Sequence, residues 1–108
     1  MKHIQYTFTD SDIQTILFTL SVLPTLSLED SDVQAHINLI NCESASEKLI
    51  EHCTDFTANE FRVIYGSLMA AQQINQGILD VDSDTKLKCS GFLFSINKLV
   101  SAFGSQMR

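Results

Sequence analysis

The sequence predicts an all-α fold, an irregular bundle of four to five helices preceded by a short extended N-terminal arm. Three observations predict it. The 108 residues include one proline and four glycines, too few turn residues for an all-β sandwich or barrel. Apolar residues recur at helical spacing along most of the chain. A content of 44% apolar and 19% charged residues is typical of one soluble globular domain, here residues 1–108.

Residues 1–9 are expected to form the extended arm. Ile4, Tyr6 and Phe8 alternate with polar residues, which is the period of a strand with one buried face. Only the segment "TLSLE" at 25–29 repeats this alternation. The arm therefore pairs with that segment, lies extended over the helices of its own domain, or adds a strand to the sheet of another chain.

The triplet "DSD" occurs at 10–12, 30–32 and 82–84, each time directly before a segment with helical spacing. Ser and Asp side chains accept hydrogen bonds from the free N–H groups of a first helical turn, and negative charge there suits the helix dipole. A calcium loop that starts at Asp80 is not expected, because Thr85 stands where the sharp turn needs glycine and Gly91 where a glutamate ligand is needed. The triplets therefore predict helix starts.

Capping signals and apolar spacing together predict five helices, at about 10–23, 31–42, 45–54, 58–79 and 84–104. Four capping boxes are expected, namely Ser11 with Gln14, Ser31 with Gln34, Ser44 with Glu47, and Thr57 with Glu60. Pro24 ends the first helix. The second helix carries one apolar face, made of Val33, His36, Ile37 and Ile40. The helix at 58–79 is apolar over more than half its circumference, which predicts a place in the middle of the bundle or between the bundle and a partner.

Two helices carry a second, smaller apolar ridge opposite their main one. The first helix has Phe18 and Val22 there, and the last has Leu87 and Phe94. Several such ridges in one small bundle indicate either a thoroughly wrapped core or a protein-binding surface.

The three cysteines, Cys42, Cys53 and Cys89, include no C-x-x-C pair and are expected to be reduced thiols. The N-terminus has one lysine, and Asp10 and Asp12 precede the first apolar run, unlike the basic start of a signal peptide. No run approaches the roughly 18 apolar residues of a membrane span. We therefore expect a cytoplasmic protein that does not enter a membrane.

The net charge of −6 is unevenly distributed. Residues 1–60 hold ten acidic residues and two lysines, a net −8, whereas residues 61–108 hold three aspartates and five basic residues, a net +2. An acidic half repels the phosphate backbone, so direct nucleic-acid binding is not expected. A basic protein partner is compatible with this charge.

The chain carries no recognisable catalytic pattern. It has no Gly-rich phosphate loop, no G-x-S-x-G and no H-E-x-x-H. The one group that resembles a zinc set, His36, Cys42, His52 and Cys53, has a spacing that fits no structural zinc pattern. We therefore expect no enzyme activity, no cofactor and no metal.

The first functional hypothesis is an inhibitor or immunity-type protein that blocks a basic partner, such as a nuclease or another nucleic-acid-binding protein. Clustered carboxylates steer association with a basic cleft and imitate phosphates. The expected partner-binding surface is the acidic face made of Glu43, Glu47, Glu51 and Asp55.

The alternative hypothesis is a self-associating structural or adaptor protein. A homodimer would bring together the spare apolar ridges across a two-fold axis, through Phe18, Val22, Leu87 and Phe94. A third hypothesis, a regulatory enzyme subunit or ligand-binding bundle, has no polar site in the sequence to support it.

Overall fold

The structure, a computed structural model, describes residues 4–5, 8–26, 32–53 and 55–106. The elements in chain order are β1 (Ile4–Gln5), α1 (Asp10–Val22), the 3₁₀-helix η1 (Leu23–Thr25), α2 (Asp32–Ile50), β2 (Asp55–Phe56), α3 (Ala58–Asn75), α4 (Ser83–Gly91) and α5 (Leu93–Gln106). The predicted fold class, an all-α irregular bundle with a short extended arm, is confirmed. Among the described helices, none combines the length and apolar character needed to cross a membrane.

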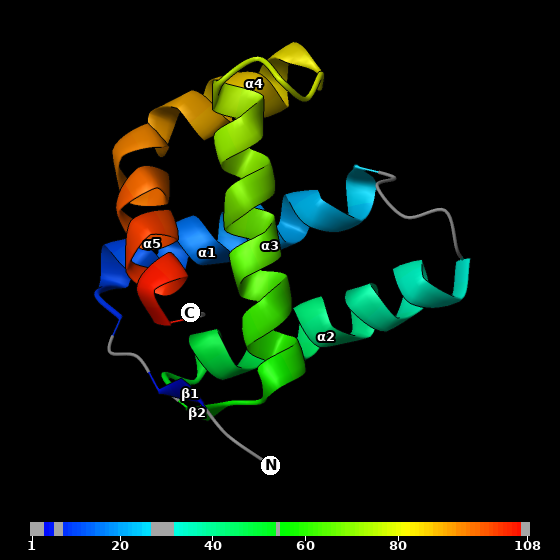
Figure 1. Cartoon of the computed structure of the whole chain (residues 1–108), viewed down its shortest axis with the longest axis vertical. Helices are drawn as coiled ribbons and strands as arrows, with labels where there is room; N and C mark the ends of the chain where they lie inside the picture. Colours follow the sequence, from blue (N-terminus) through cyan, green and yellow to red (C-terminus); the bar gives the residue numbers. More distant parts are fainter. Residues whose placement is uncertain (1–3, 6–7, 27–31, 54, 107–108) are drawn as a thin grey trace.

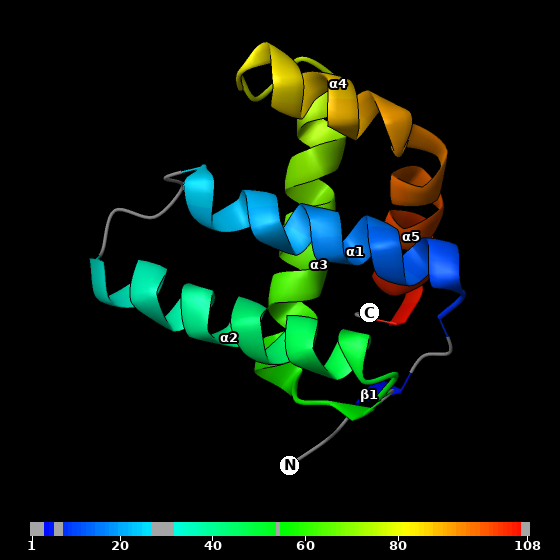
Figure 2. The same cartoon turned by 180° about the vertical axis from the view of Figure 1, so that it is seen from behind.

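Helix α3 is the central element of the bundle. It runs along the long axis of the molecule, α1 crosses it, and α5 lies beside it (Figures 1 and 2). Its buried face includes Phe61, Ile64, Leu68 and Ile74. The predicted helix at 58–79 therefore has its expected place in the middle of the bundle.

Helix α3 ends earlier than the predicted residue 79. Gly77 has a φ of 79°, a left-handed conformation that glycine adopts without steric cost. The N–H of Gly77 donates to the carbonyl of Ile74, and the N–H of Ile78 donates to that of Gln73. This is a Schellman turn, which satisfies the last carbonyls of the helix and stops it.

The described residues of the N-terminal arm, 4–5 and 8–9, lie against their own domain. β1 pairs antiparallel with β2, with Ile4 opposite Phe56. The ring of Phe8 contacts those of Phe56 and Phe103 edge to face, each with centroids 5.9 Å apart. The strand partner is therefore Asp55–Phe56 and not the segment at 25–29, of which residues 27–29 lie outside the described part.

The predicted helices at 31–42 and 45–54 are wrong, because α2 is one unbroken helix. No glycine or proline interrupts the segment 42–45, and the predicted cap Ser44 donates its hydroxyl to the Glu60 carboxylate on α3 instead. The predicted box of Ser44 with Glu47 is therefore not formed. A left-handed turn at His52, with a φ of 60°, follows the C-terminus of the helix.

The other capping predictions have mixed outcomes. The box of Thr57 with Glu60 is confirmed. At α1 the box is formed by Thr9 and Asp12 rather than by Ser11 and Gln14, because the helix already starts at Asp10. Asp82 of the third triplet caps α4 by accepting from the N–H of Thr85 at 3.3 Å. The predicted box of Ser31 with Gln34 lies outside the described residues.

The predicted single helix at 84–104 is two helices, α4 and α5, which meet at Phe92. α4 lies across one end of the molecule, and α5 turns to run alongside α3 (Figure 1). The ring of Phe92 stacks on Phe18 of α1, with centroids 5.2 Å apart and planes 20° apart. The bend lets Cys89 of α4 and Ile96 of α5 both reach a core cluster with Ile74.

The predicted apolar face of the second helix is exposed. Val33, Ile37 and Ile40 are 71%, 43% and 51% exposed, and His36 is exposed beside them. The buried residues of α2 all lie in its second half, at Cys42, Ala45 and Leu49. The first half of α2 extends past α3 in both views (Figures 1 and 2). A stripe of apolar side chains on this half is therefore left uncovered by the described part of the chain.

A candidate protein-binding groove between α1 and α2

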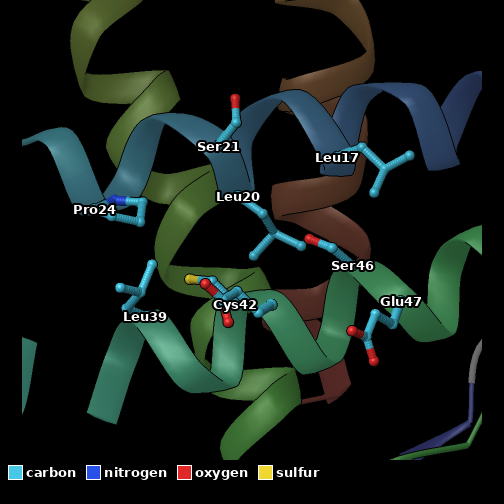
Figure 3. A pocket seen from close by; sticks show the side chains of 9 residues that line it. Leu17, Leu20, Ser21, Pro24, Leu39, Cys42, Ser46 and Glu47 are labelled. Atoms are coloured by element: carbon cyan, nitrogen blue, oxygen red, sulfur yellow. The ribbon is translucent and has the colours of Figure 1, made fainter. Parts of the chain in front are cut away.

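A groove with a volume of about 450 Å³ lies between α1–η1 and the middle of α2. Its lining residues are Leu17, Leu20, Ser21, Pro24, Leu39, Cys42, Glu43, Ser46 and Glu47. Figure 3 shows Leu20 of α1 pointing towards Cys42 and Ser46 of α2, with Leu39 beside Pro24 at one end. The floor is therefore made of aliphatic side chains, a thiol and a hydroxyl. We call this the α1–α2 groove.

One wall of the α1–α2 groove is fixed by the contacts of α1 with α3. Ile16 and Leu20 are buried, and the Thr19 and Ser67 hydroxyls form a buried hydrogen bond of 2.9 Å. This pair joins α1 directly to α3, and each hydroxyl also lies within hydrogen-bond distance of a carbonyl of its own helix, Ile16 for Thr19 and Ile64 for Ser67.

The other wall is fixed by the contacts of α2 with the start of α3. Lys48 Nζ lies 2.6 Å from Glu60 Oε1 and also donates to the carbonyl of Asp55 at 3.0 Å. Burial raises the pKa of Glu60, but hydrogen bonds from Lys48, Ser44 and the Thr57 backbone, with the Lys48 charge, outweigh it and hold the pKa below its ordinary value. Glu60 is therefore a charged anchor for α2. The α1–α2 groove lies between these two fixed walls.

The rim of the α1–α2 groove is acidic. Glu43 and Glu47 lie one helical turn apart on α2, and both are exposed. Among the described residues that line the groove, none is positively charged. The ion pairs among described side chains, Lys48 with Glu60 and Lys98 with Asp12, involve neither rim carboxylate. The rim therefore presents negative charge to any segment that enters.

The structure brings two of the four predicted partner-binding residues to this groove. Glu43 and Glu47 line it, whereas Glu51 and Asp55 are exposed beyond the C-terminal end of α2. Glu51 follows α2 directly and Asp55 begins β2, so whether all four carboxylates act as one surface stays a prediction.

Cys42 forms part of the groove floor and is not a reactive thiol. It is buried, and this burial, with a smaller effect of the Glu43 charge, raises its pKa to about 11. The thiolate is the nucleophilic form, so at neutral pH Cys42 behaves as a small apolar side chain. Of the group that resembles a zinc set in sequence, His36, His52 and Cys53 are exposed. In the described ranges, no group of three or more His, Cys, Asp or Glu residues is placed to hold a metal ion.

The four residues of the predicted apolar interface divide into two pairs. Val22 is buried, and Phe18 is half-buried against Phe92, so the pair on α1 belongs to the core. Leu87 and Phe94 are 72% and 82% exposed and lie on the surface. Sequence reasoning did not assign a binding role to the exposed stripe of Val33, Ile37 and Ile40. The exposed stripe becomes apparent once residues 32–50 are treated as one helix, because Cys42, Ala45 and Leu49 then define the opposite, buried face.

Comparisons of the chain with protein-family models, with curated proteins and with solved structures gave no match.

Proposed function

We propose that this chain is a protein-binding domain that holds a basic protein partner in the α1–α2 groove and inhibits that partner. One observation carries the proposal. The groove combines an apolar floor with two carboxylates on its rim and, among its described lining residues, no positive charge. A segment with apolar side chains flanked by Lys or Arg has the matching chemistry.

The groove suits an amphipathic helix that lies between α1 and α2. In this mode of recognition, apolar side chains at i, i+3 or i+4 and i+7 enter the groove. The exposed stripe extends the contact area, because Ile40 stands three residues before Glu43 and seven before Glu47, on the same side of α2. A specific interface buries about 800 Å² on each partner. The proposed contact therefore draws on the groove, the stripe and the acidic face together.

Inhibition follows from the acidic face. Glu51 and Asp55 extend the negative charge beyond the groove. A row of carboxylates competes for the site where a nuclease-like or nucleic-acid-binding partner would hold phosphates, and it speeds the encounter through long-range attraction. Added salt is expected to slow the association, since such attraction is screened within about 8–10 Å at physiological ionic strength.

Selection of short displayed peptides on the immobilised protein tests the binding role. The enriched peptides are expected to carry apolar residues at helical spacing together with Lys or Arg. A Glu43→Lys/Glu47→Lys variant is expected to bind them about tenfold more weakly or worse. Asp80→Lys, which reverses one exposed acidic residue outside the groove, serves as the control, and the losses are compared per reversed charge. Enrichment of acidic or uncharged peptides, or equal losses per reversed charge at both sites, would contradict the proposal.

A further inference from the structure

A second exposed surface lies where α4 meets α5. Phe94 is 82% exposed, more than any other large apolar side chain in the described residues, and Leu87 is 72% exposed. Cys89 on α4 is buried, so the face that carries Leu87 points away from the core. A Cβ added to Gly91, between these two residues in the chain, would meet no atom within 4 Å. The surface is therefore open along its length.

Two lysines border this surface. Lys86 and Lys88 are both exposed and stand on either side of Leu87 in the sequence. Successive helical residues point about 100° apart, so the two amines flank the apolar side chain. We call Lys86, Leu87, Lys88 and Phe94 the α4–α5 ridge. Its apolar side chains stand next to two cations, the chemistry that complements the α1–α2 groove, and the exposed carboxylates of Asp82 and Asp84 stand one helical turn before the two lysines, where the Lys88 charge acts on Asp82.

The ridge cannot reach the groove of its own chain. α4 lies at one end of the molecule and α2 at the other, with α1 between them, in both views (Figures 1 and 2). Any contact between the α4–α5 ridge and the α1–α2 groove therefore joins two molecules. A two-fold dimer through like surfaces is disfavoured, because it would place Glu43 and Glu47 against the same carboxylates, or Lys86 and Lys88 against the same amines.

We propose that the α4–α5 ridge of one molecule docks in the α1–α2 groove of a second copy, head to tail. This inference rests on the binding role proposed for the groove. Each molecule in such a contact keeps one free ridge or one free groove, so the assembly grows with concentration unless it closes into a ring. The basic partner and the second copy compete for the same groove, so partner binding dissolves the self-assembly.

Sedimentation of two complementary variants tests the proposal. The ridge variant Leu87→Glu/Phe94→Glu keeps its groove, and the groove variant Glu43→Lys/Glu47→Lys keeps its ridge. All four side chains are exposed, so the substitutions are expected to leave the fold intact, as thermal melts would check. The wild-type mass is expected to rise with concentration, each variant alone to stay monomeric, and their mixture to form a one-to-one dimer that grows no further.

A charge swap gives a second readout. Lys86→Glu/Lys88→Glu and the groove variant are each expected to abolish self-assembly, and one chain that carries all four changes is expected to regain it. The proposal would be overturned by a wild-type protein that is monomeric at every concentration, by a ridge or groove variant that still dimerises alone, or by a mixture that stays monomeric. The ridge variant also separates the two proposals. If it binds the selected basic peptides while the wild type does not self-associate, only the head-to-tail contact is refuted.

Discussion

Lys48 Nζ on α2 lies 2.6 Å from Glu60 Oε1 in the first turn of α3. Glu60 is buried and at the same time accepts from the Thr57 N–H as the last residue of a capping box. One carboxylate therefore caps α3 and fixes α2 to it. The buried residues of α2 all lie in the half of the helix that carries this ion pair, and the middle of α2 forms one wall of the α1–α2 groove.

Removing the lysine is expected to destabilise the fold. Lys48→Met leaves the Glu60 carboxylate buried without its charged partner, at an expected cost of about 1–3 kcal/mol in the free energy of unfolding. The double variant Lys48→Met/Glu60→Gln is expected to cost less than the sum of the two single changes, because the two residues act as a pair. Urea unfolding of the four proteins measures this coupling, with the exposed Lys86→Met as the control. Additive costs would show that the ion pair contributes no stability.

The same carboxylate predicts how stability depends on pH. The pKa of Glu60 lies below its ordinary value of 4.5 in the folded protein, so unfolding takes up a proton in the interval between the two values. The contribution of Glu60 is therefore complete above pH 4.5 and is lost as the pH falls through the lower, folded-state pKa. In Glu60→Gln, the unfolding midpoint is expected to fall less steeply below pH 4.5 than in the wild type. Parallel curves would contradict this.

The three thiols are expected to react at different rates. Cys53 is exposed, whereas Cys42 and Cys89 are buried and burial raises the pKa of both. A chromogenic disulfide reagent is therefore expected to label one thiol quickly in the folded protein and the other two only as the protein unfolds. A Cys53→Ser variant is expected to show no fast phase. A second fast thiol in the wild type would contradict the burial of Cys42 or of Cys89.

Substitutions on the two faces of α2 are expected to differ in cost. Ile40→Ser removes an exposed side chain and is expected to change the free energy of unfolding by no more than about 0.5 kcal/mol. Leu49→Ala removes a buried one and is expected to cost about 2–5 kcal/mol. Thermal or urea unfolding compares them directly. A large loss for Ile40→Ser would mean that this stripe is covered within the chain.

Local signals in the sequence were enough to predict the fold class and several helix ends. The box of Thr57 with Glu60 and the cap at Asp82 depend only on residues within one turn, and both are present. The errors have tertiary causes. Ser44 resembles an N-cap in sequence, but its hydroxyl donates to the Glu60 carboxylate, sixteen residues away. Helix α2 therefore continues past Ser44 without a break. At the bend, Phe92 stacks on Phe18 of α1, a contact between distant residues that no local pattern records.

The candidate site was predictable in its charge and not in its shape. Glu43 and Glu47 stand out in the sequence as part of an acidic segment, and both line the groove. The apolar floor depends on how α1 crosses α2, and its members Leu20 and Cys42 are indistinguishable from core residues along the chain. The pair Phe18 and Val22 shows the opposite case. Its spacing resembles a spare ridge, but Phe92 and the end of α3 cover it.

The most direct test of the groove as a binding site is a titration of the isotope-labelled protein with a synthetic amphipathic helix, followed by backbone amide shifts. The probe carries leucines at helical spacing flanked by lysines, and its control has glutamates in place of the lysines. We expect the lysine peptide to shift amides at residues 17–23 and 39–47, and the glutamate peptide to leave them unchanged. Equal binding of both peptides, or shifts confined to residues outside the groove, would contradict the account.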